Sequence, residues 1–149
     1  KRRLIYWTAI RPVSGERFQC AIESPAFEDQ SFMDRLRLSS HEIRNPVSID
    51  RFRDRWNAFL HSDDRVVVMH ASTARLLAEI QPDSRLPLIL KAIRVDDELE
   101  TADMAERCLP LSCSPANQSR AQERLAVAVE CVASLNRVFR QARGSSPVE

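Results

Sequence analysis

The chain has 149 residues, of which 44% are hydrophobic, and its 22 basic and 21 acidic side chains leave a net charge of +1. This length and composition predict a single domain with a core of its own. No apolar run approaches the roughly 18 residues of a membrane-spanning helix, so we expect a cytoplasmic protein that is not embedded in a membrane. The two glycines are too few for phosphate-binding loops of the Walker A or dinucleotide type, which excludes those two kinds of nucleotide binding.

The first residue and the cysteines indicate whether the chain is part of a longer protein and whether its thiols are reduced. It starts at Lys1 without a methionine, which predicts a piece of a longer polypeptide. Cys20, Cys108, Cys113 and Cys131 are scattered, and a domain of this size does not need disulfides, so reduced thiols are expected. Cys108 and Cys113 have a spacing that zinc sites use, but no second Cys or His pair completes four ligands. We expect neither a metal nor a cofactor.

Three stretches in the first third of the chain have the composition of β-strands. Residues 3–10 are rich in branched and aromatic side chains and lead into a turn around Gly15. Apolar and polar side chains alternate in residues 16–23 and again in residues 32–38, as they do in half-buried strands. These patterns predict three strands joined by hairpin-type connections.

A helix is predicted over residues 49–60. Ser48 is a good N-cap, and Asp50 in the first turn complements the helix dipole. Apolar side chains recur at helical spacing and predict a face that packs on the core. The members of this face are Ile49, Phe52, Trp56, Phe59 and Leu60.

Two further strands and a helix between them are predicted next. The apolar run 66–69 is typical of a strand that is buried on both faces. Ser72 or Thr73 is the expected N-cap of a helix over about 73–80, and residues 87–94 have the composition of another buried strand. A strand–helix–strand unit of this kind implies a parallel pair of strands.

The last part of the chain is predicted to be helical. The acidic segment 96–103 is expected to start a short helix, and residues 120–141 show the spacing of a long amphipathic helix that covers the sheet. The resulting fold class is α/β, with a mixed sheet of about five strands flanked by helices. We expect one domain over residues 1–143 and a flexible tail over 144–149.

Two segments resemble motifs of a known family. Residues 66–77 form an apolar strand that ends in His70 and continues into a helix, and residues 120–128 begin a helix with Arg120-Ala121 followed by Leu125. With the order of the elements, they resemble the ribonuclease H-like fold of the DEDD 3′–5′ exonucleases. That family cleaves nucleic acid with two divalent cations, which only a cluster of carboxylates holds.

The carboxylates of that family have no counterparts here. Its first acidic pair falls within Trp7–Ile10, which contains no acid, and its middle aspartate falls on Arg75. Its final histidine and aspartate fall on Gln122 and Val127. The resemblance therefore implies a pseudo-exonuclease, a domain that keeps the scaffold and has no catalytic residues.

A second resemblance suggests tRNA as a partner. The strand Trp7–Arg11 followed by Gly15–Phe18, and the segment Trp56–Leu60 followed by Asp63-Asp64, resemble the C-terminal region of long bacterial DTW-domain proteins. Their own domain resembles tRNA-uridine aminocarboxypropyltransferases, which use S-adenosylmethionine. Because the cysteines and the Asp-Thr-Trp motif of that domain do not occur here, the transferase activity is not assigned to this chain. The resemblance implies an RNA-binding or scaffolding module in a tRNA-modifying protein.

The basic side chains supply the candidate binding residues. All of them except Lys1 and Lys91 are arginines, which bind phosphates well, but the acidic residues between them favour an ordinary solvated surface over RNA binding. The candidate nucleic-acid-binding residues are Arg35, Arg37, Arg51, Arg55, His70 and Arg75. Trp7 and Tyr6 are alternatives for stacking on bases, but aromatic residues on an early strand are more typical of a core.

Two alternatives remain open. The first is an active metal-dependent nuclease with a rearranged carboxylate set, such as Asp96, Asp97 and Asp103. The second is a structural or dimerising module, for which the apolar face of the last helix is the candidate surface.

Overall fold

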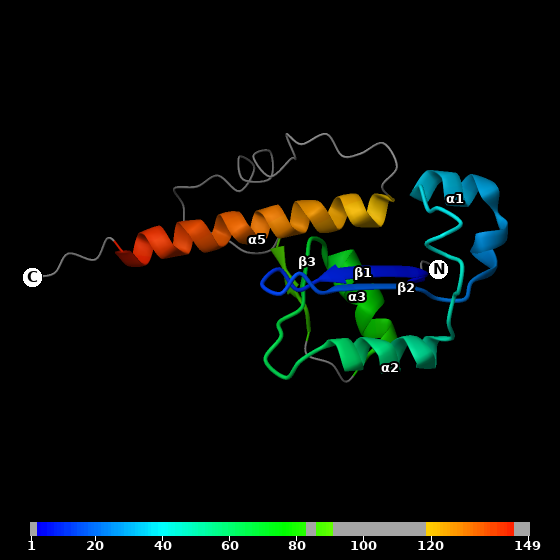
Figure 1. The fold of residues 1–149 in the computed structure, drawn as a ribbon, viewed down its shortest axis with the longest axis horizontal. Helices are drawn as coiled ribbons and strands as arrows, with labels where there is room; N and C mark the ends of the chain where they lie inside the picture. Colours follow the sequence, from blue (N-terminus) through cyan, green and yellow to red (C-terminus); the bar gives the residue numbers. More distant parts are fainter. Residues whose placement is uncertain (1–2, 83–85, 91–118, 145–149) are drawn as a thin grey trace, which may run out of the picture.

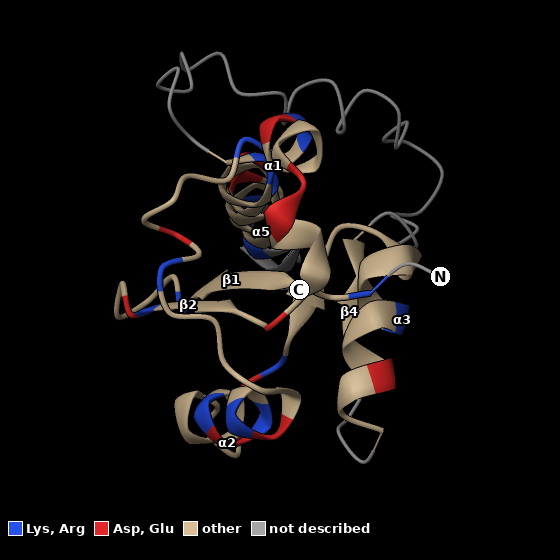
Figure 2. Cartoon of the chain, turned by 90° about the vertical axis from the view of Figure 1, so that its right-hand side faces the viewer, with Lys and Arg blue, Asp and Glu red and all other residues tan. Residues whose placement is uncertain are grey.

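The computed structural model describes residues 3–82, 86–90 and 119–144 and has a mixed α/β architecture. Helix α5 lies along one side of the β1–β2 hairpin and α2 along the other (Figure 1 and Figure 2). The elements are β1 (Tyr6–Ile10), β2 (Arg17–Ala21), α1 (Gln30–Leu36), α2 (Ile49–Phe59), β3 (Val67–Val68), α3 (Ala71–Ile80), β4 (Leu88–Ile89) and α5 (Arg120–Gly144), with a 3-10 turn at Pro25–Glu28.

The first two strands form an antiparallel hairpin, as predicted. Tyr6 lies opposite Ala21, and Ile10 lies opposite Arg17. Gly15 has a φ of 75°, a conformation that glycine adopts without the steric cost of a Cβ. The Gly15 N–H donates to the Arg11 carbonyl at 2.8 Å and closes the turn.

The predicted third strand at residues 32–38 is wrong, because Gln30–Leu36 form the helix α1. The Asp29 carboxylate accepts a hydrogen bond from the Phe32 N–H at 3.1 Å and caps the helix, and this cap was missed in the sequence. The apolar residues Phe32, Met33 and Leu36 are also spaced by helical turns, and Asp34 stands where a strand would need another apolar residue. Helix α1 ends at Arg37, which has a left-handed φ of 52°.

Helix α2 confirms the predicted helix and its cap. The Ser48 side chain accepts from the Arg51 N–H at 3.3 Å, and Asp50 lies in the first turn. Phe52 and Trp56 are buried, but Ile49 is 46% exposed, so the predicted core face begins one turn later than expected. Trp56 packs edge-on against Trp7, with 5.6 Å between the ring centroids.

Strands β3 and β4 form the predicted parallel pair, with Val67 opposite Leu88 and Val68 opposite Ile89. The predicted cap of the next helix is wrong, because α3 begins at Ala71 with His70 at the N-cap position. The His70 carbonyl accepts from the N–H groups of Thr73 and Ala74, so the chain enters the helix directly from the strand.

The described strands form two sheets of two strands each, instead of the expected single sheet of about five. One parallel bridge between Ile22 and Val47 lies beside β2, where the predicted third strand was expected. The predicted long helix is confirmed by α5, which also includes Gly144, the first residue of the expected tail. Residues 96–103, Cys108, Cys113 and the rest of the tail lie outside the described residues.

Three hydrophobic clusters hold these layers together. The largest joins one face of the β1–β2 hairpin to α2, α3 and Val68. The second packs Tyr6 and Ala21 against α1, and the third packs Leu90 against Cys131 and Leu135 of α5. Helix α5 is therefore fixed to β3 and β4 through its middle turns.

Candidate nucleic-acid interface

A groove with a volume of about 1350 Å³ runs along β1, β3, the first turns of α3 and the first half of α5. We call it the basic groove. Pockets for small ligands have volumes of roughly 300–1,000 Å³, so this groove is large enough for an extended ligand. The carboxyl end of β3 opens into it through Met69 and His70.

The charged residues that line the groove are mostly basic. Among the described residues of the lining, there are two acids, Asp64 and Glu79, and six arginines, so the lining favours an anionic ligand. All of these arginines except Arg11 are exposed. The six are Arg3, Arg11, Arg65, Arg75, Arg120 and Arg124.

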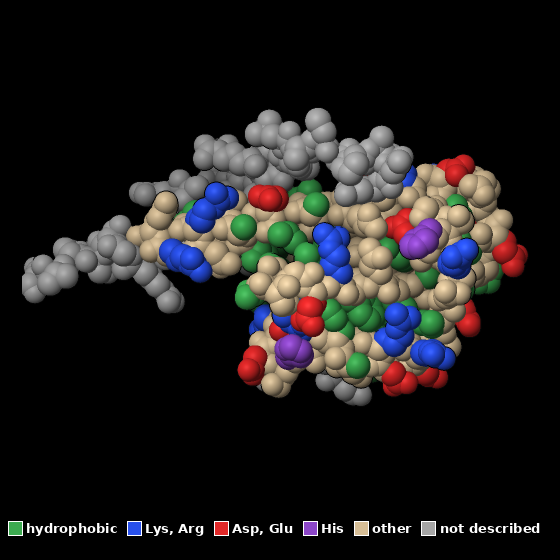
Figure 3. Space-filling view, viewed as in Figure 1, with side chains coloured by type: hydrophobic (Ala, Val, Ile, Leu, Met, Phe, Trp, Pro, Cys, Tyr) green, Lys and Arg blue, Asp and Glu red, His purple; other side chains and the backbone are tan. Residues whose placement is uncertain are grey.

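Apolar side chains make up much of the remaining lining. They come from β3 and its flanks, such as Val66 and Met69, and from α5, where Leu125 and Val129 are half-buried. Hydrophobic side chains gather along and beneath α5 on the face drawn in Figure 3, with a basic side chain among them. The groove therefore combines an apolar wall with exposed positive charge.

The predicted binding residues divide between this groove and other surfaces. His70 and Arg75 line the groove. The other four are not among the residues that line it, and the two helices that carry them, α1 and α2, lie on opposite sides of the hairpin (Figure 2). Arg35 and Arg37 belong to α1 and its C-cap, and Arg51 and Arg55 belong to α2, so these four arginines do not share one surface.

Three of those four arginines have local contacts. The Arg35 guanidinium lies over the Phe32 ring at 5.6 Å, and Arg37 forms an ion pair of 2.6 Å with Glu123 of α5. Arg55 donates to the Cys20 sulfur at 3.8 Å. The Arg37 and Arg55 contacts join separate elements, whereas the Arg35 contact lies within α1.

Arg120 and Arg124 were missed in the sequence. They are one turn apart at the start of α5, so they lie on the same side of the helix, and both line the groove with Arg75. The spacing of four within the predicted helix was the available signal. The sequence alone did not indicate that this helix faces the start of α3.

The structure brings together only some of the positions that the exonuclease resemblance assigns to carboxylates. Residues 7–10 and Arg75 line the groove, whereas Val127 packs in the cluster around Leu135. Gln122 donates a hydrogen bond of 3.0 Å to Glu42. Within the described ranges, no group of three His, Cys, Asp or Glu side chains is placed to hold a metal ion.

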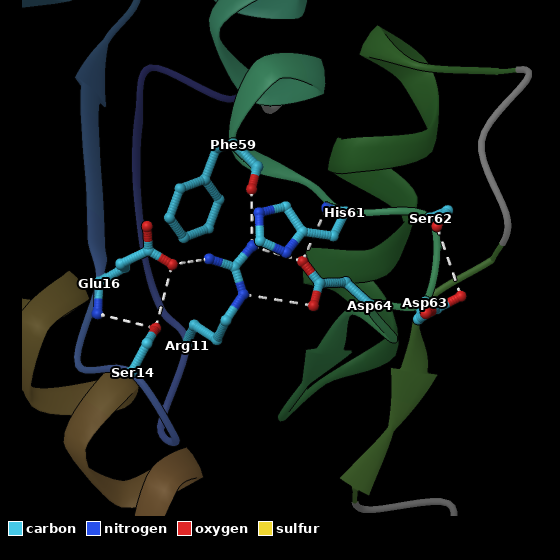
Figure 4. Close-up of polar contacts among 8 residues, drawn as sticks. All are labelled: Arg11, Ser14, Glu16, Phe59, His61, Ser62, Asp63 and Asp64. Carbon is cyan, nitrogen blue, oxygen red and sulfur yellow. Dashed lines mark hydrogen bonds and ion pairs between the residues drawn. The ribbon is translucent and has the colours of Figure 1, made fainter.

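Three residues that line the groove, Arg11, Phe59 and Asp64, form the Arg11 clamp together with Glu16 (Figure 4). Arg11 donates to Asp64 at 2.6 Å and 3.3 Å, and to the Phe59 carbonyl at 2.7 Å. It also pairs with Glu16. The clamp therefore joins the hairpin turn to the end of α2.

The clamp shifts the titration of its members. The hydrogen bond from Arg11, with a second from the His61 backbone N–H, lowers the pKa of Asp64 to about 2. The hydrogen bond to Asp64 raises the pKa of Arg11. Both groups are charged at neutral pH, and they neutralise each other. Arg11 and Asp64 therefore add no net charge to the groove.

A second polar cluster holds the first turn of α5. Both Tyr6 and Gln122 donate to one oxygen of the Glu42 carboxylate, at 3.2 Å and 3.0 Å. The other oxygen accepts from the N–H and the hydroxyl of Ser39. Burial and the negative charge of Glu42 raise the pKa of Tyr6 to about 12. Tyr6 is therefore a core residue that positions α5, which favours the core interpretation over base stacking.

Comparison of the chain with protein families, curated proteins and solved structures found no match. No helix in the described part of the chain has the length and apolar character that a membrane span requires. The groove geometry and its charges are therefore the observations on which a function is inferred.

Proposed function

We propose that this domain is a noncatalytic RNA-binding module and that the basic groove is its binding surface. The observation that carries the proposal is the convergence of exposed arginines from separate segments on one groove, with Arg75 on α3 facing the same space as Arg120 and Arg124 on α5. Arginine binds phosphate oxygens through a planar fork of donors, and several such contacts make binding sensitive to salt.

The scaffold that we propose is ribonuclease H-like. A parallel pair of strands, a helix between them and a long final helix over the strands support this assignment. In the related exonucleases, the groove would hold metal ions and the scissile phosphate. Arg75 at the position of a metal-binding aspartate would repel a divalent cation but attract a phosphate. The expected activity is therefore binding without cleavage, with tRNA as the class of RNA that the sequence resemblance implies.

The test is binding of labelled tRNA to the 149-residue chain at several salt concentrations. We expect salt-sensitive binding in the micromolar range. The double variant Arg75→Gln/Arg124→Gln should bind more weakly and lower the slope of log K against log salt by about 1 to 2, because two phosphate contacts are lost. A matched control, Arg51→Gln/Arg55→Gln, removes the same charge outside the groove and should leave the slope nearly unchanged.

The other outcomes separate the remaining hypotheses. If the α2 control loses binding and the groove variant does not, the RNA binds the α2 surface and the proposed groove is wrong. Shortening of the RNA only in Mn²⁺ would contradict a noncatalytic module and indicate a site such as Asp96, Asp97 and Asp103, which lie outside the described residues. If no RNA binds even at low salt, the structural or dimerising module remains.

A further inference from the structure

The apolar wall of the basic groove contains two side chains that lie outside the hydrophobic clusters of the described residues. Leu125 and Val129 are one turn apart on α5, are half-buried and line the groove. Within the described residues, neither belongs to any of the three hydrophobic clusters, whereas their neighbours Ala128 and Val132 pack against Leu135 and Cys131. These two residues therefore offer an apolar surface to whatever occupies the groove.

An apolar wall beside exposed arginines suits single-stranded RNA better than duplex RNA. A duplex presents its phosphates and sugars on the outside and keeps its base faces stacked, so it has no flat apolar surface to offer. A single strand has base faces that pack on an apolar wall while its phosphates stay near arginines. Arg124 lies next to Leu125 in sequence, and both line the groove, so the two kinds of contact are available side by side.

Among its described residues, the groove lacks the side chains that bind adenine edges, and its two acids already have partners. Asn and Gln side chains, which bind adenine edges through paired hydrogen bonds, do not line the groove in the part of the chain that the structure describes. Of the two acids, Asp64 accepts hydrogen bonds on both oxygens within the Arg11 clamp, and Glu79 also has an interaction partner. The carboxylates of the groove are therefore already engaged and are poorly placed to accept hydrogen bonds from base edges.

We infer that the basic groove binds single-stranded RNA without a preference for base sequence. This inference rests on the proposed function and adds the form of RNA and the basis of its recognition. Affinity then depends on the number of unpaired nucleotides in the groove and on salt. For a folded RNA such as tRNA, the groove binds an unpaired segment and not a stem.

The test compares four labelled RNAs of equal length at one salt concentration: oligo(U), oligo(A), a mixed-sequence single strand, and the same mixed strand in a duplex. We expect the three single strands to bind within about threefold of one another and the duplex about tenfold more weakly. A preference of more than about tenfold for one sequence would overturn sequence independence. Equal or tighter binding of the duplex would overturn single-strand recognition, and failure of all four RNAs to bind would instead refute the proposed function.

A variant of the apolar wall tests the second kind of contact separately. Leu125→Gln should weaken single-strand binding by about tenfold, because an apolar contact is lost, and should leave the salt slope unchanged because no charge is removed. Val138→Gln is the matched control, since Val138 is half-buried on the same helix outside the groove. If Leu125→Gln binds as tightly as the control, or lowers the salt slope as an arginine variant does, the apolar wall does not contact the RNA.

Discussion

Arg37 offers a direct test of whether residues 30–36 form a helix. It is the described non-glycine residue with a positive φ, and its left-handed conformation ends α1. A residue with a Cβ in this conformation loses roughly 1–2 kcal/mol relative to right-handed backbone. Glycine avoids that cost but loses about 0.4–1 kcal/mol through the greater freedom of its unfolded chain. We therefore expect Arg37→Gly to be about 0.5–1 kcal/mol more stable than Arg37→Ala.

The comparison of these two variants isolates the backbone, because both lose the exposed ion pair with Glu123. Exposed pairs contribute only about 0.2–1 kcal/mol, so both variants should remain folded. The free energy of unfolding is measured by urea denaturation monitored by circular dichroism. In a strand, glycine would instead be less stable than alanine by about 0.5–1 kcal/mol. An Arg37→Gly variant that is less stable than Arg37→Ala would therefore refute the helix and restore the predicted strand.

Three further predictions concern the core and the two polar clusters. Phe52 is fully buried and packs edge-on against Phe18, so Phe52→Ala should lower the free energy of unfolding by about 3–5 kcal/mol in urea titrations; a loss below about 1 kcal/mol would contradict its burial. Because the pKa of Asp64 is lowered from 3.8 to about 2, its ion pair stabilises the fold above pH 4 and is lost as the pH falls towards 2. Asp64→Asn should therefore be less stable than the wild type at neutral pH, with a difference that closes across that range, and a pH-independent difference would contradict the ion pair. Tyr6 is the single tyrosine, and its pKa of about 12 predicts that phenolate absorbance rises well above pH 10 and that stability is lost between pH 10 and 12; a titration midpoint near 10 with the fold intact would show that the hydroxyl is not buried.

The elements that the sequence determined are those whose signals lie within a few residues. Ser48 and Asp50 define the start of α2, and the alternation in residues 16–23 defines β2, because caps and strand periodicity act over one or two turns of chain. The apolar run 66–69, which contains β3, is likewise a signal within a few residues. The failure at residues 32–38 was also local. Phe32 and Leu36 fit both periods, and the Asp29 cap that decides between a strand and a helix was not recognised.

The candidate site was decided by the tertiary structure. His70 and Arg75 could be selected from the sequence because they follow a predicted buried strand, but Arg35 and Arg51 could not be separated from them. Arg35 and Arg51 lie on opposite sides of the hairpin because of the faces by which α1 and α2 pack on the core. Charge patterns along the chain give the helix face on which an arginine lies, but not the element opposite that face.

The basic groove also depends on contacts between elements that the sequence pattern does not predict. Arg120 and Arg124 line the same groove as Arg75 because α5 packs over β3 and β4 through Leu135 and Cys131. The hydrogen bonds of Tyr6 and Gln122 to Glu42 fix the first turn of α5. Those contacts join residues far apart in the sequence, so their geometry depends on the whole packed core and not on any local pattern. The sequence by itself determined α2, α3, α5 and the first hairpin, and it has no acidic residue at Trp7–Ile10, Arg75, Gln122 or Val127. Only long-range packing decided which arginines share a surface.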